Sequence, residues 1–122
     1  MILADTSVWI DHFRHDRSDL RALLEADLIH SHEFVIGELA CGTLRRRSEI
    51  LSRLAQLRRV PAVSHAEALE FLHARGMSGR GLGWIDIHLL ASTVVAGAQL
   101  WTLDRRLAAA ATRLRVGRIQ SR

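Results

Sequence analysis

The stretch of sequence that decides the fold is the first seven residues, Met1-Ile2-Leu3-Ala4-Asp5-Thr6-Ser7. A short apolar run that ends in turn chemistry is typical of a fully buried strand, and a Ser or Thr after such a run is a common helix N-cap. We therefore expect Asp5 at the carboxyl end of a central strand, followed by a helix over 8–13. In an open parallel sheet, that edge is where ligands bind. For Asp5 taken alone, however, a role as a cap or turn residue is the simpler explanation.

Beyond this stretch, apolar runs alternate with helical patterns along the whole chain. Further strands are expected at 28–31, 60–63, 99–103 and 114–119, and further helices at 18–25, 34–41, 48–57, 65–75, 84–97 and 105–111. Pro61 has no N–H to donate, so the strand at 60–63 should lie at an edge of the sheet. Ser64 and Glu67 have the spacing of a capping box, which would open the next helix. Strands that alternate with helices predict an α/β fold with a parallel sheet. No linker is evident, so we expect one domain over 1–122.

Composition narrows the class of protein and of partner. The 122 residues are 48% apolar, which suits one soluble domain with one core. All 17 basic residues are Arg and the formal net charge is +4. Because the guanidinium fork suits phosphate and stacks on bases, a nucleic acid partner is favoured. The one Cys excludes a disulfide framework and a Cys-based zinc site. Neither a leader pattern nor a membrane-spanning run is evident, and we expect the reducing cytoplasm.

Four of the 13 acids stand apart from polar neighbours: Asp5, Glu38, Asp86 and Asp104. Asp5 and Asp104 each follow an expected strand. The other two lie in expected helices that are otherwise apolar. A buried ionised carboxylate is costly without a partner, so such groups pair with a base or bind a metal. A separate arginine partner for each acid would account for them. Convergence at one edge of the sheet would instead require a hard divalent cation, which prefers oxygen ligands.

Taken together, four short motifs resemble those of a known family. They are Asp5-Thr6-Ser7, Gly37-Glu38-Leu39, Gly83-Trp84-Ile85-Asp86 and Thr102-Leu103-Asp104. Their order and spacing resemble a PIN domain and, more narrowly, the VapC toxins of bacterial toxin–antitoxin pairs, from residue 1 to about residue 119. The resemblance implies a five-stranded parallel sheet in the order 3-2-1-4-5. That order would bring Asp5 and Asp104 together and would leave strand three at an edge.

The activity of that family is Mg²⁺- or Mn²⁺-dependent RNA cleavage, held in check by a VapB antitoxin, and its members form homodimers. The resemblance implies that the metal ligands, direct or through water, are Asp5, Glu38, Asp86 and Asp104. It also implies supporting hydroxyls at Thr6, Ser7 and Thr102. Arg105 and Arg106 come next, where many relatives carry another acid or polar residue, and this difference leaves open whether the site holds one metal ion or two.

Charge and the remaining motifs bear on the substrate. Setting aside the four acids leaves nine acids against 17 arginines, an excess that favours a polyanion. Arg80 lies in the glycine-rich loop 76–83 and is the candidate RNA phosphate contact, although an ordinary solvent-facing arginine fits equally well. A response-regulator receiver would need a Lys near its phosphorylated Asp, and the chain has no Lys. A PIN-like binding module without catalysis stays as the alternative function.

Overall fold

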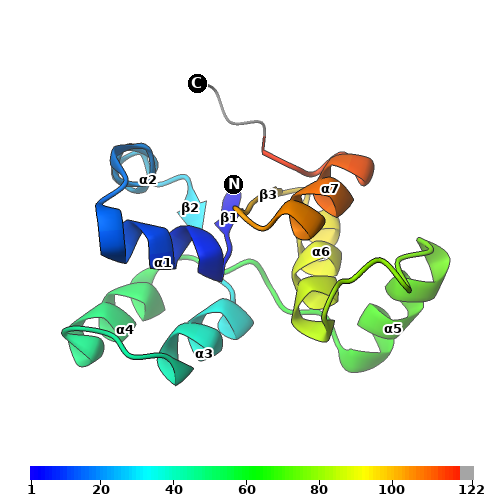
Figure 1. Ribbon diagram of the computed structural model, residues 1–122, viewed down its shortest axis with the longest axis horizontal. Helices are drawn as coiled ribbons and strands as arrows, with labels where there is room; N and C mark the ends of the chain where they lie inside the picture. The colour runs from blue at the N-terminus through cyan, green and yellow to red at the C-terminus, as the bar shows by residue number, and fades with distance from the viewer. Residues whose placement is uncertain (119–122) are drawn as a thin grey trace.

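A parallel sheet of three short strands lies at the centre of the computed structural model, which describes residues 1–118. The central strand β1 (Ile2–Ala4) pairs on one side with β2 (Ile29–His30) and on the other with β3 (Gln99–Trp101). In the β1–β3 register, Ala4 pairs with Trp101, so the two parallel strands end side by side at the carboxyl edge of the sheet. Figure 1 shows β1 in the middle of the molecule, with helices on both sides of the sheet. The predicted α/β class and parallel sheet are confirmed.

The prediction of five strands was wrong in number. Beyond β2, the segment predicted as strand three contributes one parallel bridge, Ser31 to Arg59, in which the Val60 amide donates to the Ser31 carbonyl at 2.8 Å. Pro61 follows at once and has no N–H with which to extend that pairing. The two outer bridges nevertheless lie where the order 3-2-1-4-5 places its first and last strands.

The segment predicted as the last strand, 114–119, is likewise reduced to one bridge beside β3, between Leu100 and Gly117. Leu114 is still the C-cap of the preceding helix, and Arg115 has a left-handed backbone with φ 62°. The chain therefore has only a few residues in which to pair with Leu100. Residue 119 of this prediction lies outside the described residues.

Seven helices surround the sheet in the described part of the chain. They are α1 (Thr6–His15), α2 (Ser18–Glu25), α3 (Glu33–Cys41), α4 (Arg47–Gln56), α5 (His65–Ala74), α6 (Trp84–Ala96) and α7 (Arg105–Arg113). Each corresponds to a predicted helix, although α1 runs further, to His15. The capping box predicted from Ser64 and Glu67 is present at the start of α5. In Figure 1, α1, α3 and α4 gather on one side of the sheet, and α5, α6 and α7 on the other.

The core lies between the sheet and these helices. All three residues of β1 are buried, and α6 contributes a continuous buried run from Ile87 to Thr93. Burying one side chain of the size of Leu stabilises a fold by about 1.5–3 kcal/mol. This packing therefore fixes the end of β1, where Asp5 leaves the sheet. None of the helices among the described residues is both long and apolar enough to span a membrane.

Candidate functional site

The site is built around Asp5, whose carboxylate is buried where β1 ends. Asp5 is the N-cap of α1, and its Oδ1 accepts hydrogen bonds from the Val8 amide at 3.2 Å and the Ser7 hydroxyl at 2.5 Å. The Thr102 hydroxyl donates to Oδ2, also at 2.5 Å. Burial raises the pKa of Asp5, because desolvation penalises the charged form more than the hydrogen bonds to the carboxylate favour it. An ionised Asp5 would therefore gain stability from a neighbouring positive charge.

Thr102 links Asp5 to the second strand-borne acid. Its Oγ1 donates to Asp5 and accepts from the backbone amide of Asp104 at 3.0 Å. Ser7 adds a parallel link, because its Oγ accepts from the Leu103 amide at 2.9 Å. Asp104 is the N-cap of α7, where its Oδ1 accepts from the Leu107 amide at 3.0 Å. The structure thus brings Asp5 and the Asp104 segment together, as the expected strand neighbours required.

Glu38 reaches the same edge from α3. Its Oε1 accepts the Thr6 hydroxyl at 3.0 Å, and Thr6 is the residue after Asp5. Helices α1 and α3 pack together, which holds this pair in place. The three hydroxyls predicted as supporting groups therefore all contact one of the predicted acids. Thr6 contacts Glu38, whereas Ser7 and Thr102 contact Asp5.

Asp86 stands in the first turn of α6 and is tied to its own helix. Its Oδ2 accepts from the Gly83 amide at 3.0 Å. Helix α6 lies against α3 through Phe34 and His88, whose ring centroids are 4.7 Å apart. Trp84, at the start of α6, is 38% exposed and contacts the same His88 ring. No hydrogen bond within residues 1–118 joins Asp86 to the other three acids.

The bonding of the four acids suits a cation in its chemistry. Among residues 1–118 none of them forms an ion pair, although arginine or histidine partners are found for four other acids: Asp11, Asp16, Asp19 and Glu49. Separate arginine partners therefore do not account for the site. The second carboxylate oxygen of Glu38, Asp86 and Asp104 has no hydrogen-bond partner in this part of the chain.

The four acids do not form a complete set of metal ligands in this structure. In the described residues no three Asp, Glu, His or Cys side chains lie close enough together to hold a metal ion. The convergence of all four acids on one cation consequently stays a prediction. The four carboxylates fit a hard cation in donor type and in charge. Three of them are linked at the carboxyl edge of the sheet: Thr102 links Asp5 to the Asp104 segment, and Thr6, the residue after Asp5, contacts Glu38.

Two arginines, Arg80 and Arg106, lie on or against the glycine-rich loop 76–83. The predicted phosphate contact, Arg80, turns back on its own loop, where its Nε donates to the Gly76 carbonyl at 2.9 Å. Its role stays a prediction. Arg106, to which the sequence assigned no contact, lies with its side chain against Gly81 of the glycine-rich loop. The only signal in the sequence was its place two residues after Asp104.

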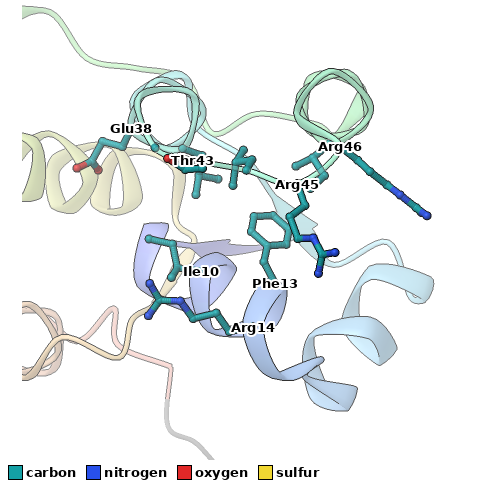
Figure 2. A pocket seen from close by; sticks show the side chains of 11 residues that line it. Ile10, Phe13, Arg14, Glu38, Thr43, Arg45 and Arg46 are labelled. Carbon is teal, nitrogen blue, oxygen red and sulfur yellow. The ribbon is translucent and has the colours of Figure 1, made fainter.

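A groove of about 970 Å³ begins beside Glu38 and runs between α1 and the segment that joins α3 to α4. Its floor is apolar, from Ile10, Phe13, Leu39, Leu44 and Ile50. In Figure 2, Glu38 lies at one end of the groove, and Arg45 and Arg46 lie at the other end. The groove therefore combines an apolar middle with charged ends, Glu38 at one and Arg45 and Arg46 at the other. Arg14 adds a positive charge to its wall beneath Ile10.

Comparisons with known proteins agree with this geometry. The family model described as PIN domain matches residues 2–113. The chain is 48% identical, over 111 residues, to Ribonuclease VapC32 of Mycobacterium tuberculosis, in both the CDC 1551 / Oshkosh and the H37Rv strains, and the match covers 90% of each chain. The crystal structure of PAE2754 from Pyrobaculum aerophilum superposes on this chain with a TM-score of 0.60 at 19% sequence identity. The superposition covers 88% of this chain and 77% of PAE2754, and it supports the fold. This protein therefore belongs to the PIN-domain family and, within it, to the VapC ribonucleases.

Proposed function

We propose that this chain is the toxin of a type II toxin–antitoxin pair, an endoribonuclease that depends on Mg²⁺ or Mn²⁺. The observation that carries the proposal is the group of four acids without an arginine partner in residues 1–118 of a chain with 17 arginines. If the four carboxylates converge as proposed, a divalent cation with oxygen ligands would offset the repulsion between them. Membership of the VapC ribonucleases supports RNA as the substrate.

The cation would be held by the four acids, Asp5, Glu38, Asp86 and Asp104. When bound, Mg²⁺ or Mn²⁺ supplies Lewis acidity toward the phosphate and lowers the pKa of water. In the hydrolysis, a water molecule loses a proton as its oxygen bonds to phosphorus, the ester bond from phosphorus to oxygen breaks, and the departing oxygen takes up a proton in turn. Thr102 and Ser7 fix the orientation of Asp5, and Thr6 fixes that of Glu38, so that these two carboxylates are oriented before RNA arrives.

The partner we propose is a VapB-like antitoxin whose tail lies in the groove beside Glu38. An amphipathic helix laid in an apolar groove is a common mode of recognition. The charges of the groove favour a tail with a basic residue near Glu38 and acidic residues near its three arginines, Arg14, Arg45 and Arg46. From the family resemblance, we also propose that the chain forms a homodimer and acts in the cytoplasm.

The decisive experiment compares the wild type with Asp5→Asn. Asn keeps the shape of the side chain, and its one oxygen can still accept from Ser7 and Val8. It removes the charge that would hold the cation, and its amide nitrogen cannot accept the Thr102 hydroxyl. We expect Asp5→Asn to lose most metal-dependent RNA cleavage while keeping a cooperative thermal transition. Cleavage of a mixed-sequence single-stranded RNA is followed with Mg²⁺, with Mn²⁺ and with EDTA.

The outcomes separate the two candidate functions. If the wild type binds RNA but leaves it intact with either metal, the chain is a binding module without catalysis. If Asp5→Asn melts like the wild type and cleaves equally fast, the role of Asp5 is refuted.

A further inference from the structure

The side chain of Arg106, in the first turn of α7, packs against the backbone of Gly81. Gly81, in the glycine-rich loop, has φ +74°, and a Cβ placed on it would lie 2.8 Å from Arg106 Nη1 and 3.0 Å from Arg106 Cδ. These distances are shorter than ordinary van der Waals contacts, so only a residue without a side chain lets Arg106 lie there. The loop and the arginine therefore fit each other.

This contact joins two of the segments that carry the acids. Arg106 is two residues after Asp104, in the first turn of the helix that Asp104 caps. Gly81 is two residues before Gly83, whose amide donates to Asp86. The guanidinium of Arg106 is therefore a positive charge set between the Asp104 segment and the Asp86 segment.

The guanidinium is nonetheless available for a ligand. Within residues 1–118 it forms neither an ion pair nor a hydrogen bond, unlike Arg17 and Arg53, which each bind a carboxylate. In contrast, the Nε of Arg80, on the same loop, already donates a hydrogen bond to the Gly76 carbonyl. A guanidinium offers five donors in a planar fork that matches phosphate oxygens. Because Arg106 rests on the loop before any ligand arrives, it has less freedom to lose on binding.

We propose that Arg106 is a phosphate-binding residue of this site, which contacts a non-bridging oxygen of the RNA phosphodiester beside the acids, and that Gly81 positions its guanidinium. The inference rests on the proposed ribonuclease function. Negative charge on those oxygens changes as the phosphoryl group passes through its transition state, and a fixed cation there stabilises it. The arginine would also offset repulsion between the RNA backbone and the four carboxylates.

The first test replaces the guanidinium. Arg106→Ala is compared with Arg105→Ala, which removes the same charge from the neighbouring exposed position. The probe is a fluorescein-labelled single-stranded RNA of mixed sequence, followed by anisotropy in EDTA so that binding is measured without cleavage. We expect Arg106→Ala to weaken binding and to reduce the slope of log affinity against log salt by about 0.7, the value for one phosphate contact on a single strand. In Mg²⁺, we expect its cleavage rate at saturating RNA to fall about a hundredfold.

The second test moves the guanidinium without removing it. Gly81→Ala places a methyl group against Arg106, whereas Gly79→Ala has nearly the same backbone strain, at φ +72°, with no atom within 4 Å of its Cβ. We expect Gly81→Ala to lower the cleavage rate well below that of Gly79→Ala at similar melting temperatures. Arg106→Lys should keep most RNA binding in EDTA but recover only part of the rate, because an ammonium group lacks the fork.

The results distinguish failure of this inference from failure of the proposed function. Should Asp5→Asn be inactive while Arg106→Ala matches Arg105→Ala in affinity, salt slope and rate, the inference about Arg106 is overturned and the ribonuclease proposal stands. Should Gly81→Ala and Gly79→Ala cleave equally, Gly81 does not position the guanidinium. If Asp5→Asn cleaves like the wild type, the function itself is wrong.

Discussion

At the scale of single residues, the site depends on hydroxyl groups as much as on carboxylates. Thr102 is buried, and its one hydroxyl both donates to Asp5 and accepts from the Asp104 amide. A buried carboxylate whose pKa is already raised has few means of staying ionised. Losing that hydroxyl would raise the pKa of Asp5 further and would release the turn that carries Asp104.

Thr102→Val removes the hydroxyl and keeps the shape, so it tests this link directly. We expect the free energy of unfolding to fall by about 1–3 kcal/mol, because the Asp5 carboxylate and the Asp104 amide both lose a partner. Affinity for Mg²⁺ or Mn²⁺ should fall by about 10–100-fold, as for the loss of a group that orients a metal ligand. Urea denaturation and calorimetric metal titration measure the two effects.

Thr102→Ser is the matched control, since it restores the hydroxyl and removes only a methyl group. Metal affinity close to that of the wild type in the Ser variant, together with a loss in the Val variant, would support the link. An equal loss in both variants would show that packing of the methyl group matters and the hydroxyl does not.

At the scale of elements, His32 connects two helices that carry acids. Its Nδ1 accepts from the Phe34 amide and so caps α3, and its Nε2 lies 3.0 Å from the Ser92 hydroxyl of α6. An acceptor role at Nδ1 requires the proton on Nε2, which then donates to Ser92. Burial lowers the pKa of His32, because the charged ring would be poorly solvated.

This arrangement predicts a pH dependence of stability. Above the unfolded pKa of about 6.5, His32 is neutral in both states. As the pH falls below that value, the unfolded chain takes up a proton that folded His32 resists, so the free energy of unfolding should decrease. Urea midpoints measured across this range should show the decrease.

Asn is a good N-cap and does not titrate, so His32→Asn should make the dependence of the urea midpoint on pH shallower. Part of the dependence should stay, because burial lowers the pKa of His88 as well. An exposed control, His73→Asn, should leave the dependence unchanged. An unaltered slope in His32→Asn would assign the effect to other histidines.

The elements also show how far sequence can predict this structure. Every helix was predicted, since apolar spacing and caps such as Ser64 are local signals. The number of strands was not, because pairing at Arg59 and Gly117 depends on backbone geometry that side-chain patterns do not encode. The supporting hydroxyls at Ser7 and Thr102 were expected only from the family resemblance. The contact of Arg106 with Gly81 depends on the path of a loop, which no spacing specifies.

At the scale of the whole molecule, the groove and the acids share Glu38, so inhibition and metal binding should compete. A short antitoxin peptide with an Arg near Glu38 would place its positive charge where the cation is proposed to bind. Raising Mg²⁺ should therefore increase the inhibition constant of the peptide. Titrations of cleavage at several Mg²⁺ concentrations measure this effect.

A peptide with Gln in place of that Arg is the control for this competition. Its inhibition constant should be weaker and should not vary with Mg²⁺. If the Arg peptide also inhibits independently of metal, the tail acts away from the acids, although it can still occupy the apolar groove.

The exposed Trp84 has an optical consequence. The chain has three tryptophans and no tyrosine, so near-ultraviolet emission from the folded protein comes from indole alone. Trp9 and Trp101 are buried, whereas Trp84 is 38% exposed and two residues from Asp86. The solvent-sensitive part of the spectrum therefore originates beside Asp86. The protein carries its own label at the place where cation and RNA are proposed to arrive, and binding there can be followed on the unmodified chain.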